Sequence, residues 1–150
     1  MAELGTFAIA AKRIEAFVGS LESEIKEAGE EFATAFTKKV KENIETQALP
    51  WEPLTEKWQE YKARHGLDPR ILISTGGMVG AIDFEYNEGD GDNVLGYVTV
   101  GSGYEELAII HEYGTSTIPP RPFIAPTIHE MEDKAEEIFN KAIQDALEGL

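Results

Sequence analysis

The sequence has 150 residues, a common size for one domain and long enough to bury a hydrophobic core without a metal or a disulfide. It contains no cysteine, which excludes disulfides, thiol nucleophiles and cysteine-ligated zinc. Its formal charge of -15, from 28 acidic and 13 basic residues, argues against binding to a phosphate backbone. No apolar run approaches the ~20 residues of a membrane span, so we expect a soluble protein.

Residues from about 7 to 47 show a sustained helical pattern. Apolar side chains recur every three or four positions along one stripe: Ile14, Phe17, Val18, Leu21, Ile25, Ala28, Phe32, Phe36, Val40 and Ile44. The pattern predicts one or two long amphipathic helices, with Gly19 and Gly29 as candidate bends. A continuous helix at ~1.5 Å per residue would reach about 60 Å, which exceeds the width of a compact domain of this size. Part of it must therefore project, bend or pack on another subunit.

A short helix is predicted after Leu49-Pro50. Thr55 is placed to cap a helix that runs to about His65, and Gly66 is placed to end it. Asp68-Pro69 then predicts a turn.

The two tryptophans, Trp51 and Trp58, flank the start of this helix. Tryptophan buries a large area and needs one polar partner, which favours a core anchor. It is also enriched at protein interfaces, so an interface anchor is the alternative interpretation.

The second half of the chain predicts a small sheet followed by helices. Alternating apolar residues predict an antiparallel β-hairpin at about 82–101, with the polar residues 87–93 at its tip. Residues 104–113 predict a short helix, and a C-terminal helix is expected from Ala125 or Pro126 onward. The fold class is therefore α+β. We expect a single domain over 1–150, with a helical arm at 1–48 and an α+β core at 49–150.

The candidate chemical motifs are incomplete. His111-Glu112 begins the zinc pattern H-E-x-x-H, but the second histidine is replaced by Thr115. Asp90-Gly91-Asp92-Asn93 lacks the glycine and glutamate that a calcium loop needs, and Ser74-Thr75-Gly76-Gly77 lacks the lysine of a phosphate loop. We expect no enzyme activity, no metal and no cofactor, with His111 as a partly buried structural residue.

Several segments together resemble one protein family. The segments are WEPLTEKW, ILISTGGM, VLGYVTVGS and LAIIHEYGTSTIPPRPFIAPTI, followed by an amphipathic C-terminal helix. They resemble the tail-completion or virion-morphogenesis family of tailed bacteriophages, which includes head-tail joining and minor tail components. The resemblance covers about 51–145, and the part from Glu112 to Phe123 is its most specific. Met78, Ala81 and Leu107 depart from the usual residues but keep an apolar or small side chain.

This resemblance implies an assembly role without catalysis. It implies a ring of identical subunits at the neck, with the head connector or stopper and the tail tube or terminator as partners. DNA would pass through the lumen without specific binding, and no membrane would be involved. The protein would be found in the virion, at the neck or tail, after assembly in the host cytoplasm.

The proline-rich segment suggests how the interface or an internal latch is built. Pro119, Pro120 and Pro122 hold the chain extended, so Arg121 and Phe123 would be presented rigidly. Arg121 is expected to pair with Glu112 within the subunit as a latch, or with an acidic neighbour in the ring. Phe123 is expected to be buried. The candidate interface or latch residues are thus Glu112, Arg121, Phe123 and Trp51.

The acidic excess leaves further alternatives open. A lumen lined by carboxylates would repel DNA and let it slide, whereas the other reading of the charge is simple solubility. A different class of function is an acidic DNA mimic or regulatory protein that inhibits a DNA-handling enzyme. That reading requires carboxylates spaced like phosphates, and it gives no reason for the PPRPF segment.

Overall fold

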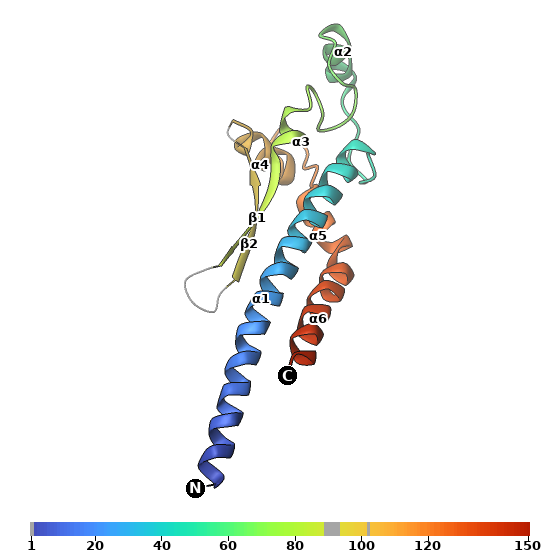
Figure 1. Cartoon of the computed structure of the whole chain (residues 1–150). Helices are drawn as coiled ribbons and strands as arrows, with labels where there is room; N and C mark the ends of the chain where they lie inside the picture. Colours follow the sequence, from blue (N-terminus) through green and yellow to red (C-terminus); the bar gives the residue numbers. More distant parts are fainter. Residues whose placement is uncertain (1, 89–93, 102) are drawn as a thin grey trace. The chain divides into compact units, whose positions relative to one another are not determined.

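The computed structural model describes residues 2–88, 94–101 and 103–150, and it has the predicted α+β composition (Figure 1). In chain order the elements are α1 (Ala2–Glu45), α2 (Glu56–Arg64), α3 (Gly77–Ala81), β1 (Ile82–Glu88), β2 (Val94–Val100), α4 (Glu105–Tyr113), α5 (Ile124–Glu130) and α6 (Glu132–Glu148). None of the helices in the described part of the chain combines the length and the apolar character needed to cross a bilayer.

The chain divides into two compact units. Unit 1 comprises Met1–Phe32 and Glu132–Leu150, and unit 2 comprises Ala33–Met131. The division falls inside α1, whereas the sequence predicted an arm at 1–48. The single domain over 1–150 stays a prediction.

In unit 1, the first part of α1 packs against α6. A small core forms from Ala28, Ile138 and Ala142, and partly buried Ile25, Phe32 and Phe139 pack against it. A Cβ on Gly149 would lie 4.0 Å from Ser20 Oγ, so the end of α6 lies close to Ser20. Since the middle of α6 meets Ala28 and its end meets Ser20, the two helices run antiparallel.

In unit 2, the last part of α1 supplies the largest buried side chains. Phe36 is 1% exposed, Val40 and Ile44 are fully buried, and the ring of Phe36 lies 5.5 Å from that of Phe84 on β1. Asn43 Nδ2 donates to Thr127 Oγ1 at 3.0 Å and to Glu130 Oε2 at 2.9 Å, which satisfies a fully buried amide.

The predicted hairpin at 82–101 is confirmed. Strands β1 and β2 pair antiparallel, with Ile82 opposite Val100 and Phe84 opposite Val98. The centre of its tip, residues 89–93, lies outside the described residues, and so does the sequence Asp90-Gly91-Asp92-Asn93.

Several local signals in the sequence also predicted the structure correctly. The Thr55 side chain accepts a hydrogen bond from the Trp58 N–H, as an N-cap residue does, and Gly66 has a positive φ of 63° after the helix. The candidate bends at Gly19 and Gly29, by contrast, do not interrupt α1, which is one helix from Ala2 to Glu45.

The C-terminal helix differs from its prediction. Instead of one helix from Ala125 or Pro126, there are two, α5 and α6, separated at Met131. Met131 has φ -101° and ψ 6°, outside the α-helical range, and its side chain is 7% exposed. Hydrophobic periodicity could not reveal this break, because methionine is not a helix-breaking residue type.

Candidate functional site

The segment between α4 and α5 is a folded-back loop with its own hydrogen bonds. Helix α4 ends at Tyr113, and the next residue, Gly114, has φ 71° and ψ -179°. The Thr115 N–H donates to the Ile118 carbonyl at 2.8 Å, and Thr115 Oγ1 accepts from the Ile118 N–H at 3.0 Å. The Arg121 N–H then donates to the carbonyl of His111 at 2.7 Å, so the proline segment lies back along α4.

Arg121 and Trp51 join this loop to the segment before α2. Arg121 is 6% exposed, and its guanidinium donates to two main-chain carbonyls, from Nε to Glu52 at 2.8 Å and from Nη2 to Pro53 at 3.1 Å. In the opposite direction, Trp51 Nε1 donates to the Pro122 carbonyl at 2.7 Å. We call these five residues, Trp51, Glu52, Pro53, Arg121 and Pro122, the clasp.

Glu112 binds different groups from those expected. Its Oε2 accepts from the N–H groups of Phe123 at 2.8 Å and Ile124 at 3.0 Å, and its Oε1 accepts from the N–H of Ala125 at 2.9 Å. These amides begin α5 and have no acceptor within their own helix. A carboxylate at a helix N-terminus is also favoured by the helix dipole.

The expected ion pair between Arg121 and Glu112 is therefore wrong. Both side chains do hold the loop within the subunit, but each binds main-chain groups: Arg121 the carbonyls of Glu52 and Pro53, and Glu112 the amides of α5. The reason is that buried main-chain groups need partners, and these two charged side chains supply them.

The remaining candidate residues lie largely inside the subunit. Phe123 is 1% exposed, as predicted, and Trp51 is half-buried with its indole N–H satisfied. Phe123 and Arg121 offer almost no surface to a neighbour, so any interface here would be formed by the residues around them. An interface role for the four candidates stays a prediction.

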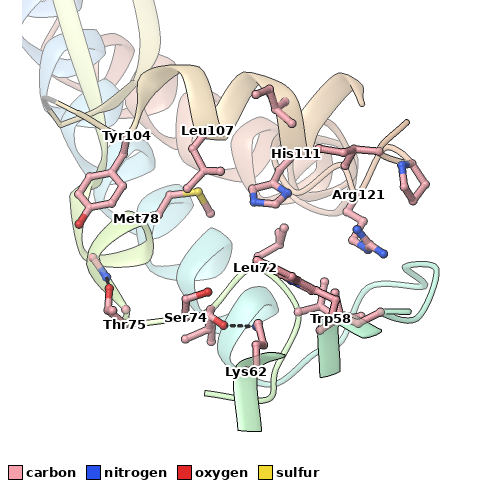
Figure 2. A pocket seen from close by; sticks show the side chains of 18 of the residues that line it. Trp58, Lys62, Leu72, Ser74, Thr75, Met78, Tyr104, Leu107, His111 and Arg121 are labelled. Carbon is pink, nitrogen blue, oxygen red and sulfur yellow. Dashed lines mark hydrogen bonds between the residues drawn. The ribbon is translucent and has the colours of Figure 1, made fainter. Parts of the chain in front are cut away.

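A pocket of about 480 Å³ opens beside the clasp (Figure 2). Its walls come from α2, the 71–78 segment, α4 and the loop 117–121. Large apolar side chains around it remain exposed, namely Trp58, Leu107 and Ile118. The pocket is thus apolar, accessible and bordered by the segment that the sequence singled out.

The charges lining the pocket have one sign. Among the described residues, no acidic side chain lines it, although the sequence carries 28 acidic residues, whereas the cations Lys62 and Arg121 and the imidazole of His111 do. Lys62 is 3% exposed, and its Nζ donates to the carbonyls of Arg70 at 2.7 Å and of Ile73. Burial lowers the pKa of Lys62, the nearby Asp68 partly raises it again, and Arg121 lowers it further.

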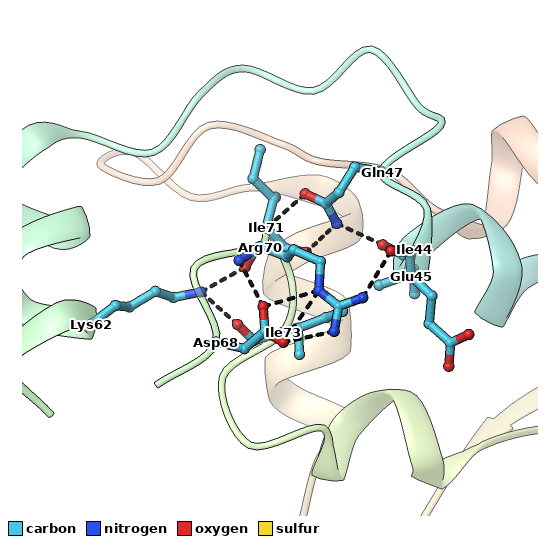
Figure 3. A network of polar contacts seen from close by, with 8 residues as sticks. All are labelled: Ile44, Glu45, Gln47, Lys62, Asp68, Arg70, Ile71 and Ile73. Carbon is cyan, nitrogen blue, oxygen red and sulfur yellow. Dashed lines mark hydrogen bonds and ion pairs between the residues drawn. The ribbon is translucent and has the colours of Figure 1, made fainter. Parts of the chain in front are cut away.

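One wall of the pocket is held by a polar network (Figure 3). The Arg70 side chain donates to both Asp68 oxygens, which lowers the pKa of Asp68 to about 2, and Arg70 Nη1 donates to the Glu45 carbonyl at 2.9 Å. Gln47 Oε1 accepts from the Ile71 N–H at 2.8 Å, and its Nε2 donates to the Ile71 carbonyl at 3.0 Å. The network ties the end of α1 to the 68–73 segment.

His111 faces the pocket from α4 (Figure 2). Its Nδ1 is buried and has no hydrogen-bond partner among the described residues. Burial lowers the pKa of His111, and the positive charges of Arg121 and Lys62 lower it further. These effects favour the neutral form of the imidazole, and His111 is partly buried, as expected from the sequence.

Sequence reasoning did not single out Lys62, Arg70 or Gln47. A local signal existed for one of them, since Asp68-Pro69-Arg70 has the spacing of an Asx-turn, and Asp68 Oδ1 does accept from the Arg70 N–H at 2.9 Å. Lys62 and Gln47 bind groups farther along the chain, and no local pattern in the sequence marks them.

Comparison with known proteins finds two relatives. The chain is 27% identical over 128 residues to an uncharacterized protein of Methanocaldococcus jannaschii, covering 79% of this chain and 90% of the relative. It is 34% identical over 76 residues to the Mu-like prophage FluMu G protein 1 of Haemophilus influenzae. That alignment covers 49% of this chain and 47% of the relative, so it spans about half of the prophage protein.

No family model matches the chain, and no solved structure matches it. The partial similarity to the prophage protein points to a phage-related protein. The tail-completion family itself stays a prediction.

Proposed function

We propose that the chain is a structural virion assembly protein of a tailed phage or prophage, which joins or completes the tail at the head-tail interface as part of a ring. Two observations support this proposal: the partial similarity to a Mu-like prophage protein, and the EYGT to PPRPF segment that resembles tail-completion proteins. The observation that carries it is the clasp, because the most specific part of that resemblance is a built structural feature of the subunit.

The clasp supports an assembly role by fixing a surface in advance. Because the hydrogen bonds of Arg121, Trp51 and Glu112 are made inside the subunit, the loop needs little reordering when a partner binds. The surface on the pocket side of this loop is apolar: Leu107 on α4 and Ile118 on the loop both line the pocket and are 42% and 37% exposed. These two residues, here called the α4 surface, form the contact with a neighbouring virion protein.

The ring would use this surface against a different face of the next subunit, because a cyclic ring of more than two subunits needs heterologous contacts. Among the described residues, the pocket beside the α4 surface is lined mostly by apolar side chains and by no acid, which favours a partner segment with apolar groups. The acidic excess outside the pocket would keep DNA from binding as it passes through the lumen.

The test is complementation in the phage or prophage that encodes the chain. Removing the gene should yield heads and tails that fail to join, or tails of abnormal length, in electron micrographs, while phage DNA replication continues. Normal tailed and infectious particles without the gene would overturn the proposal, and so would a loss of DNA replication with no assembly defect.

A matched pair of variants tests the α4 surface within this role. Leu107→Asp places a charge in the apolar surface, whereas Leu147→Asp changes an equally helical leucine in α6 that is 50% exposed. We expect Leu107→Asp to fail in complementation and Leu147→Asp to succeed, with both proteins folded by circular dichroism. Equal success of both variants would contradict a contact through this surface.

A further inference from the structure

The N-terminal half of α1 carries an apolar seam that continues beyond the part covered by α6. Taking every third and fourth residue gives a strict heptad alternation through Phe7, Ala11, Ile14, Val18, Leu21, Ile25, Ala28 and Phe32. This is the a and d spacing of helices that pack side by side over several turns. We call these positions the α1 seam.

The α1 seam is already used as an interface along its second half. Ile25, Ala28 and Phe32 pack against Ile138, Ala142 and Phe139 of α6. The rings of Phe32 and Phe139 lie 6.4 Å apart. This half shows that the seam is a working helix-packing surface within the subunit.

No side chain in the described part of the chain covers the first half of the seam in this way. Phe7, Ile14 and Val18 are 73%, 63% and 46% exposed, and exposure falls only where the seam approaches α6, whose end lies close to Ser20. An isolated helix with this much exposed apolar surface on one face is unusual in a monomer. A second helix that continued the contact of α6 would bury it.

The charge balance of residues 2–18 favours a second copy of the same segment as the partner helix. Within 2–18 two acids, Glu3 and Glu15, balance two bases, Lys12 and Arg13, so the whole excess of -15 lies elsewhere in the chain. A copy of this segment can therefore approach it without the repulsion that the rest of the surface imposes. The flanking positions Ala8 and Ala10 are small, which permits close approach of two helices.

A lipid surface fits the segment less well. Interfacial helices bind anionic lipids through a polar face rich in lysine and arginine. Here residues 2–18 have only two bases, Lys12 and Arg13, and the next part of α1 is strongly acidic.

We infer that the exposed half of the α1 seam, Phe7 to Val18, pairs with the same segment of a second copy of this chain. Pairing extends the helix contact that α6 makes along the second half. The inference does not depend on a role in the virion, because a chain that fails to complement a phage can still pair.

Two isoleucines on this helix provide a matched test. Ile14 lies on the seam and is 63% exposed, whereas Ile9 lies off the seam and is 61% exposed. We expect sedimentation equilibrium, from micromolar to near-millimolar protein, to show self-association of the unaltered chain. Ile14→Asp should weaken that association by about tenfold or more, since it would bury a charge, while Ile9→Asp should change it by less than about twofold.

The absence of cysteine gives an independent measurement. Ile14→Cys should form a covalent dimer under mild oxidation, and Ile9→Cys should form much less at the same concentration. This readout holds even if the aspartate variants alter the helix. A chain that stays monomeric throughout, an equal effect of the two aspartates, equal cross-linking of the two cysteines, or association only with added lipid vesicles would each overturn the inference.

Discussion

Arg121 illustrates how a charged side chain becomes part of the interior. Its guanidinium donates to the carbonyls of Glu52 and Pro53, and its own N–H donates to the carbonyl of His111. One residue thus ties the proline segment both to the segment before α2 and to α4. Its flanking prolines have no N–H, so the Arg121 N–H is the main-chain donor of residues 120–122.

The first prediction concerns this residue. Arg121→Met keeps the aliphatic stem but leaves two carbonyls without their donors, so it should lower the free energy of unfolding by about 2 to 4 kcal/mol. Arg64→Met, which removes an arginine whose side chain is 77% exposed, should change it by less than about 0.5 kcal/mol. Denaturant unfolding measures both.

A charge reversal separates the observed contacts from an ion pair. Arg121→Glu should destabilise the protein, and adding Glu112→Arg should destabilise it further, because a cation would then face the amides that begin α5. Recovery of stability in the double variant would show that the two side chains do pair.

The second prediction concerns the pH dependence of stability at His111. Burial holds its pKa below the ordinary value of about 6.5, so the unfolded chain takes up a proton at higher pH than the folded chain. Its contribution to stability is therefore present above about pH 6.5 and declines as the pH falls below it. Unfolding midpoints measured from pH 7.5 to 5.5 should fall in the unaltered chain and less steeply in His111→Gln. Parallel curves for the two proteins would contradict this.

At the level of elements, the turn after α4 decides where the proline segment goes. Gly114 has φ 71° and ψ -179°, a conformation essentially restricted to glycine. A Cβ there would lie 2.8 Å from both the Ile118 carbonyl oxygen and the Pro120 nitrogen. The loop can fold back on α4 only because this position has no side chain.

The third prediction compares this glycine with another. Gly114→Ala should cost more than about 2 kcal/mol, since conformational strain and a main-chain clash add together. Gly66→Ala, at φ 63° with open space around it, should cost about 1 kcal/mol. Equal effects in thermal unfolding would show that the loop moves without cost.

At the level of the whole molecule, α1 belongs to two compact units. Its last part is buried, with Phe36, Val40 and Ile44 at 1% exposure or less, whereas its first part is exposed along the α1 seam. The side chains of one continuous helix are therefore packed in its last part and exposed to solvent in its first part. Helices without packing are only marginally stable in water.

The fourth prediction follows from this contrast. In dilute protein, amide hydrogens of 7–18 should exchange much faster than those of 36–44. At high protein concentration the exchange at 7–18 should slow, because pairing would protect it, while 36–44 should be unchanged. Hydrogen exchange read by mass spectrometry or NMR measures both segments, and uniform protection along α1 at low concentration would contradict the prediction.

The sequence by itself determined the features that depend on neighbours along the chain. The Thr55 cap, the hairpin at 82–101 and the helix before Gly114 follow from short-range periodicity and turn chemistry. The burial of Phe123 was also predictable, as an aromatic residue at the start of a helix.

Only the tertiary structure decided the features that depend on partners far along the chain. Arg121 donates to the carbonyls of Glu52 and Pro53, and Glu112 accepts from the amides that begin α5. Lys62 donates to the carbonyls of Arg70 and Ile73. The physical reason is that a charged side chain binds whichever unsatisfied groups the fold brings within hydrogen-bond distance. Main-chain carbonyls and amides are present at nearly every residue, so no residue type in the sequence marks which of them will need a partner.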